Sequence, residues 1–341
     1  MNVTVGIPTY KNNGTTIVGL LNSLTLQTYR DFKVIIVYKP TPEDKTLDVI
    51  ERFKKSLDIE ILIQKSGLFD EALNMLYSSA SDELLITTDD DAIPSSTWIE
   101  EHVKLHENFS NIGVIGPVNE RSENVLRRNQ SNSYLLARLF QTIMERPIDK
   151  QMMGFNDYFS RGGLLVRNYY VTDHEKIQKT FNPIGVNMSI KRGVYKGFSL
   201  FPMTLRGIGN EPYLCLHAYL NDMPCARVTS HLAKVNHLER DSLSRPRNPL
   251  AITERYAEMM LSPYVLSKYY EINLNELRLD ALIRTKIWSL KVRSEEDKFA
   301  LRGIKEGVKL AINAIEKDMP PDWIRHRLKL IQDNNCTEPP D

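Results

Sequence analysis

Short apolar runs alternate with segments of helical spacing over the first half of the chain. The runs are rich in Val and Ile and cover residues 3–7, 33–37, 59–63 and 84–87. Between the first two runs, one face of a helix is indicated by the spacing of Ile17, Leu20, Leu21 and Leu24. Strands that are apolar on both faces and alternate with helices are typical of a parallel sheet covered on two sides. The first half of the chain is therefore predicted to be α/β.

Weaker strand patterns follow in the middle of the chain, at residues 112–118, 163–167 and 185–190. Residues 225–237 alternate enough to be a late strand or an extended loop. These runs are expected to extend the same sheet.

The strand pattern ends near residue 249, and three helical segments are expected over residues 253–271, 274–292 and 294–319. In the third segment, Ser294 and Asp297 stand at capping-box spacing before a helical apolar face. Arginines and prolines at 240–251 mark either a domain boundary or a flexible lid, although ordinary linkers have the same composition. We predict one domain over 1–240 and a helical region over 241–341.

Overall composition narrows the class of protein without choosing a partner. A chain of 341 residues suits one large unit with a smaller appendage. The 44 Lys+Arg against 43 Asp+Glu give a net charge of +1, which does not favour nucleic acid.

The cysteines and the apolar runs bear on the compartment. Cys215, Cys225 and Cys336 are too few and too scattered to indicate a disulfide framework or a thiolate metal site, and such scarcity suits a reducing compartment. With neither a leader pattern nor a run of about 18 apolar residues, we expect a soluble, cytoplasmic protein.

Three successive carboxylates, Asp89, Asp90 and Asp91, directly follow the apolar run 84–87. Ligands of parallel α/β sheets bind at the carboxyl ends of the strands. In an extended backbone Asp89 and Asp91 point to one side and Asp90 to the other. Two oxygen donors on one side suit Mg²⁺ or Mn²⁺ together with substrate phosphate oxygens, and the alternative is a solvated acidic turn.

Five ordered elements resemble the family 2 inverting glycosyltransferases of the GT-A fold. They read "VTVGIPTYKN", "LLNSLTLQTYRDFKVIIV", "KSGLFDEALNMLYSSASDELLITTDDDAIP", "PIGVNMSIKRGVYKGF" and "GIGNEPYLCLHAYLND". The resemblance covers residues 1 to about 240. It implies a mixed, mostly parallel sheet flanked by helices, here followed by a C-terminal helical appendage, and transfer of a sugar from a nucleotide-diphosphate donor to a hydroxyl group.

The resemblance also implies a donor site. Pro8, Thr9 and Tyr10 would form the wall against the base and ribose, although a plain strand end would need the same residues. Asp89 and Asp91 look like the Asp-x-Asp pair, with Asp91 as the more direct metal ligand.

Two further residues are assigned to the donor side with less specificity. Asp90 is assigned to the donor site because it lies within the acidic triplet. Lys65 precedes a glycine and a helix and could equally be a solvated loop residue.

Further positions match the acceptor side of the family pattern. Glu211, in "NEPYL", stands where the general base is found, with Glu in place of the usual Asp and an amide before it; a surface Glu at a helix start is the alternative. Asn187 matches a position on the strand that lies beneath the acceptor sugar in the family; the alternative is a residue of the core. Either His231 or His237 could complete the metal site, with His237 ahead, although a lone histidine is more often structural.

One departure concerns the nucleotide base. Many relatives carry an acid after the second strand, whereas this chain reads "VYKP" at 37–40. A UDP-sugar is our first expectation; guanosine and thymidine donors stay open, with base recognition by backbone groups or Asp44. The acceptor could be a glycan, a lipid-linked molecule or a protein.

Two other functions compete with this interpretation. A sugar-phosphate nucleotidyltransferase usually opens with a Gly-rich phosphate loop, and "PTYKNNG" has one glycine in seven. A non-catalytic nucleotide- or carbohydrate-binding module would keep the sheet without a usable base.

The role of the tail is also open. Residues 281–293 could form a basic amphipathic helix that lies on the inner face of a membrane, or that packs on the protein itself or on a second subunit.

Overall fold

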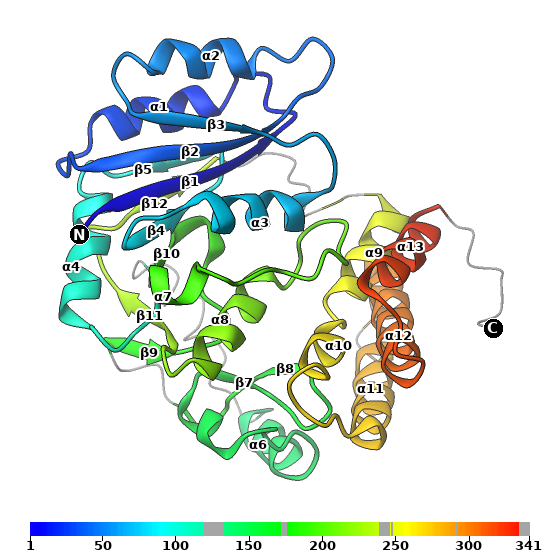
Figure 1. Ribbon diagram of the computed structural model, residues 1–341. Coiled ribbons are helices and arrows are strands. Elements are labelled where there is room, and N and C mark those ends of the chain that lie inside the picture. Colours follow the sequence, from blue (N-terminus) through cyan, green and yellow to red (C-terminus); the bar gives the residue numbers. More distant parts are fainter. Residues whose placement is uncertain (119–132, 172–175, 239–245, 247, 291, 334–341) are drawn as a thin grey trace.

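Eight strands form one mixed sheet in a computed structural model of the protein, which describes residues 1–118, 133–171, 176–238, 246, 248–290 and 292–333. Their order across the sheet is β3, β2, β1, β4, β10, β6, β11, β9 (Figure 1). Their bounds are β1 Val3–Tyr10, β2 Phe32–Lys39, β3 Ile59–Ile63, β4 Leu84–Thr87, β6 Val114–Val118, β9 Ile177–Lys179, β10 Met188–Lys191 and β11 Cys225–Thr229. Only β10 and β9 run antiparallel to their neighbours. The predicted mixed, mostly parallel sheet is confirmed.

Helices cover both faces of this sheet. Val34 and Ile36 of β2 belong to one core layer, and Ile35 and Val37 to the other, because successive side chains of a strand alternate. The first layer is covered by α1 Ile17–Thr25, α2 Thr46–Phe53 and α4 Trp98–Asn108, and the second by α3 Phe69–Ser79 and α8 Asn210–Leu220. This double cover explains why the strands are apolar without alternation.

Five helices follow the sheet and stack together beside it (Figure 1). They are α9 Pro249–Glu258, α10 Ser262–Leu266, α11 Leu274–Ser289, α12 Glu295–Glu316 and α13 Pro321–Gln332. The predicted capping box is present: Asp297 N donates to Ser294 Oγ at 3.1 Å, and Ser294 N donates to Asp297 Oδ2 at 2.9 Å. The sequence analysis identified this helical region but not α13. The domain boundary at residue 240 stays a prediction, and residues 240–245 and 247 lie outside the described part.

Most of the elements that periodicity missed are short. Residues 185–187 form a 3-10 turn rather than a strand, and residues 225–237 divide into β11 and β12 Val235–His237. Elements of three to five residues contain too few positions to show a period. The other unpredicted elements are α6 Ser133–Met144, η1 Lys150–Gly154, β5 Ala92–Pro94, β7 Asp157–Phe159, β9 and α7 Arg192–Tyr195, whereas β8 Leu165–Arg167 lies within the expected run at 163–167.

The cysteine expectation was wrong for one pair. Cys215 of α8 and Cys225 at the start of β11 form a disulfide. The chain turns back between α8 and β11, so residues ten apart in sequence face each other. Cysteine scarcity therefore gives no support for a reducing compartment; Cys336 lies outside the described residues.

The surface of α11 bears on the predicted membrane contact. Leu282, Ile287, Trp288 and Leu290 are exposed on this helix, and Lys291 lies outside the described residues. Within the described ranges, each helix is too short or too polar to cross a bilayer. Contact with a membrane surface stays a prediction.

Candidate active site

A cavity of about 1390 Å³ opens at the carboxyl ends of β1, β2 and β4. One part of its wall contains the end of β1 and the acidic triplet, and another part contains residues 205–213. Residues of the C-terminal helices also line it, among them Glu258, Met259, Lys329 and Gln332. The cavity therefore lies where the sheet and the helical region meet.

The acidic triplet emerges from β4, whose Leu84, Leu85 and Ile86 are fully buried. His237 Nε2 lies 3.0 Å from Asp91 Oδ1 and 3.3 Å from Asp89 Oδ2. The antiparallel pairing of β12 with β5 sets His237 opposite Ala92, next to Asp91. The backbone of the triplet turns, with Ala92 N donating to Asp89 O at 3.2 Å. A turn, and not an extended strand, therefore places Asp89 and Asp91 on the same side.

Asp89, Asp91 and His237 are residue types that bind metal ions, and we call these three side chains the metal-type cluster. One ligand atom from each of Asp89, Asp91 and His237 lies within 4.8 Å of the others. Hydrogen bonds with Asp89 and Asp91 raise the pKa of His237 to about 10, so that in the metal-free protein its imidazolium balances the two carboxylates. Two carboxylates and one imidazole suit Mn²⁺ or Mg²⁺ when the histidine is deprotonated.

Asp90 faces the end of β1 instead. Thr9 Oγ1 donates to Asp90 Oδ2 at 2.5 Å, and burial raises the pKa of this carboxyl to about 6. Pro8, Thr9 and Tyr10 line the cavity. The predicted donor wall and the acidic triplet thus share one side of the cavity.

Lys39 is the last residue of β2 and lies in the segment 37–40, where many relatives carry an acid and this chain does not. Its Nζ donates to Gly67 O at 2.5 Å and lies 5.0 Å from the centre of the Tyr10 ring. Asp44 does not line the cavity; its carboxylate accepts from Thr46 N at 2.9 Å, at the start of α2. Asp44 therefore has a local capping role in this structure.

Glu211 lies in the first turn of α8, which begins after Gly209 in the left-handed region at φ 93°. Burial, and to a smaller extent the charge of Asp89, raise the pKa of its carboxyl to about 7. A Cβ on Gly185 would lie 2.0 Å from Glu211 Oε1, so glycine is required there for lack of space. The carboxylate is therefore held closely in the cavity, between the metal-type cluster and the turn at Gly185.

Three predicted residues are not brought into the cavity. Asn187 is buried; its Nδ2 donates to Pro117 O and Ala233 O, and its Oδ1 lies 2.7 Å from Trp98 Nε1 and 3.0 Å from His102 Nε2. Asn187 thus supports the core beneath the site and is not placed to touch an acceptor. Neither Lys65 nor His231 lines the cavity, and both are exposed. Of the two candidate histidines, only His237 is close to the carboxylates.

Several lining residues were missed by the sequence analysis. Arg206 lies in the wall before Glu211, and its Nε is 2.5 Å from Glu254 Oε2 on α9. Asn210 is buried, and its Nδ2 has no hydrogen-bond partner among the described residues. Arginine and asparagine are common on protein surfaces, so their residue types gave no signal. Only the tertiary contacts of Arg206 and Asn210 identify them as residues of the site.

Comparison with known families decides the assignment. The family model described as glycosyl transferase family 2 matches residues 4–196, more than half of the chain. The chain belongs to glycosyltransferase family 2. The match contains β1, β4 and the acidic triplet and ends before Glu211. This glycosyltransferase therefore carries its metal-type carboxylates inside the matched region and its predicted base outside it.

Solved structures identify the fold of this glycosyltransferase as GT-A. The crystal structure of S. aureus TarS 1-349 is similar with 16% sequence identity and a TM-score of 0.51, covering 99% of this chain and 93% of that chain. The same protein in complex with UDP-GlcNAc gives a TM-score of 0.54, again at 16% identity, over 98% of this chain and 92% of that chain. No curated protein sequence matches the chain.

Proposed function

We propose that this glycosyltransferase is metal-dependent and inverting, and that it moves a sugar from a nucleoside-diphosphate donor to a hydroxyl group of its acceptor. The observation that carries this proposal is that one cavity contains both a group of metal-ligand side chains and a separate carboxylate that can act as a base. Asp89, Asp91 and His237 form a divalent-metal set, and Glu211 lines the same cavity as a separate carboxylate.

The three clustered side chains would hold Mn²⁺ or Mg²⁺. A bound divalent ion stabilises the negative charge that develops on a departing diphosphate. Of the two carboxylate ligands, the Asp91 side chain is 19% exposed and the Asp89 side chain is 43% exposed. This difference supports Asp91 as the more firmly held ligand.

The donor nucleotide would lie against Pro8, Thr9 and Tyr10, with Asp90 fixed behind them by Thr9. UDP is our first choice of nucleotide. The TarS structure that holds UDP-GlcNAc has the same fold, which supports a uridine donor. Because the segment 37–40 has no acid and Lys39 lines the cavity, the base would meet a hydrogen-bond donor at the end of β2.

Glu211 would be the general base. The acceptor oxygen forms a bond to the anomeric carbon as the bond from that carbon to the diphosphate breaks, and the hydroxyl proton passes to Glu211. A single displacement of this kind inverts the anomeric configuration. With a pKa of about 7, Glu211 is substantially ionised near neutral pH and basic enough to take the proton.

Residues 1–240 would bind the donor, and residues 241–341 would complete the acceptor side. A glycan, a lipid-linked molecule or a protein could be the acceptor.

The experiment is calorimetry with UDP-, GDP- and TDP-sugars, with and without Mn²⁺, followed by product analysis. We expect one donor to bind only with the metal, nucleoside diphosphate to be released, and NMR to find an inverted anomeric bond in the product. The proposal would be contradicted by release of pyrophosphate, by a product with retained anomeric configuration, or by sugar transfer that is undiminished in the presence of a metal chelator.

A further inference from the structure

We propose that the C-terminal helices position the base, with Glu258 of α9 as the positioning residue for the segment that precedes Glu211. This inference rests on the proposed function of Glu211. The segment, residues 204–209, leads directly into α8, and its residues 205–209 line the cavity.

Glu258 binds the segment through its backbone. Glu258 Oε1 accepts from Leu205 N and from Arg206 N, the latter at 3.0 Å, and Glu258 Oε2 accepts from Ile208 N at 3.3 Å. The Glu258 side chain is fully buried, so water does not replace these bonds. One side chain from the helical region therefore holds three backbone amides within four residues of the segment.

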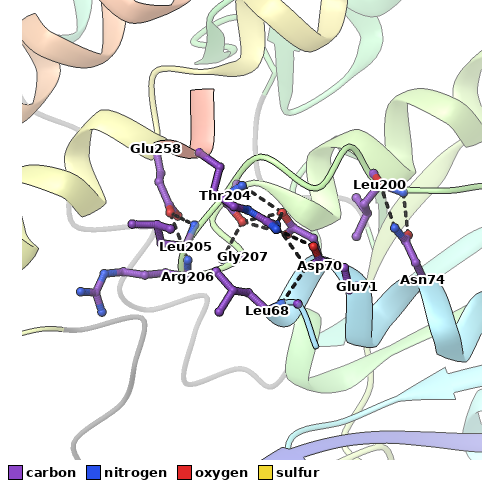
Figure 2. A network of polar contacts seen from close by, with 12 residues as sticks. Leu68, Asp70, Glu71, Asn74, Leu200, Thr204, Leu205, Arg206, Gly207 and Glu258 are labelled. Carbon is purple, nitrogen blue, oxygen red and sulfur yellow. Dashed lines mark hydrogen bonds and ion pairs between the residues drawn. The ribbon is translucent and has the colours of Figure 1, made fainter. Parts of the chain in front are cut away.

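Asp70 of α3 holds the same segment from the other side. Its carboxylate accepts from Thr204 N at 3.0 Å and from Thr204 Oγ1 at 2.8 Å, and Thr204 Oγ1 in turn accepts from Gly207 N at 2.9 Å. Figure 2 shows Glu258 and Asp70 on opposite sides of the segment. The wall is thus clamped between the sheet domain and the helical region.

A second helix of the C-terminal region reinforces the clamp. Arg325 of α13 contacts Glu71 at 2.5 Å and Asp70 at 3.5 Å. On α9, Glu254 lies beside Glu258 and binds Arg206 Nε of the segment. Burial and the neighbouring Glu254 raise the pKa of Glu258.

The position of Glu211 leaves little room for movement of this segment. Gly209 ends it in the left-handed region, Glu211 follows two residues later, and the carboxylate lies against Gly185. A misplacement of about 1 Å can cost roughly 100-fold in rate. Loosening the clamp should therefore lower the rate of transfer more than it lowers donor binding.

The test is Glu258→Gln, with Glu271→Gln on the exposed surface of the same region as the matched control. We expect kcat to fall at least about tenfold, while the donor Kd with Mn²⁺ and the acceptor KM stay within about twofold. Amide hydrogen exchange at residues 204–209 should become faster in Glu258→Gln and stay unchanged in the control.

A second variant covers the case in which Glu258→Gln does not fold. Thr204→Val removes the hydroxyl bonds to Asp70 and Gly207 at nearly constant volume, and we expect the same split between kcat and Kd. Unchanged exchange at residues 204–209, unchanged kcat, or a raised acceptor KM at constant kcat would overturn the inference. If the wild-type chain transfers no sugar, the proposed function fails, and the exchange measurement still decides whether the clamp exists.

Discussion

The two walls of the cavity are held in different ways. The donor wall lies at strand ends, and sheet pairing places its side chains: β4 delivers the acidic triplet, and the β5–β12 pairing delivers His237. The other wall contains residues 205–209, and the segment 204–209 lies outside the sheet ladders of the described residues. It is held by single side chains from distant elements, with Asp70 and Glu258 at sequence separations of 134 and 53 from their partners.

This difference indicates how each wall responds to change. A sheet ladder spreads its support over many backbone hydrogen bonds, so replacing one side chain removes a ligand and leaves the frame intact. A clamp of buried carboxylates concentrates the support, so replacing one side chain moves the frame itself. Metal and donor binding should therefore be separable from the chemistry of transfer.

Replacing the base should give the largest effect. We expect Glu211→Gln to lower kcat by roughly 1000-fold, because the neutral amide cannot take the hydroxyl proton. Donor binding with Mn²⁺ should stay unchanged, since the metal-type cluster lies on the other wall. Steady-state kinetics and calorimetry measure both, with Glu271→Gln as the control. If Glu211→Gln stays fully active, Glu211 is not the base.

The next largest effect should come from the donor wall. Asp91→Ala removes the less exposed carboxylate of the cluster and should weaken Mn²⁺ binding by about 100-fold or more, since even outer partners of metal ligands contribute about 10–100-fold. Donor binding should lose its metal dependence. Titration calorimetry tests this against Asp58→Ala on the exposed surface, and undiminished Mn²⁺ affinity would remove Asp91 from the site.

A smaller effect is expected where the two walls meet. Gly185→Ala adds a Cβ 2.0 Å from Glu211 Oε1, which must displace the carboxylate. We expect kcat to fall about 10–100-fold with donor affinity preserved. Gly154→Ala is the matched control, because a Cβ there meets nothing within 4 Å. Equal kinetics for the two variants would show that the position of Glu211 does not limit transfer.

A fall of one pH unit should give the smallest effect. Because burial and Asp89 raise the pKa of Glu211 to about 7, protonation removes the base as the pH falls through that value. Below about pH 7, kcat should fall about tenfold per pH unit, and above it kcat should level off. A pH profile at saturating donor and Mn²⁺ measures this, and a flat profile between pH 5 and pH 7 would contradict it.

The sequence could predict much of the donor wall. Apolar runs placed β1 to β4, and the acids after residue 87 fell at a strand end because the run before them was long and buried. His237 was the favoured histidine, and the structure brings it to Asp89 and Asp91. The reason for its position, the three-residue pairing of β5 with β12, was not predicted, because strands this short show no period.

The amino-acid sequence by itself determined the α/β architecture, the helical region and the strand end that carries the carboxylates, because these depend on local periodicity and on chain order. Only the tertiary structure decided that Asn187 is a core residue, that Cys215 meets Cys225, and that α9 and α13 reach the cavity. Such contacts join residues far apart in sequence, and the burial and hydrogen bonding that give them their energy exist only after the chain has folded.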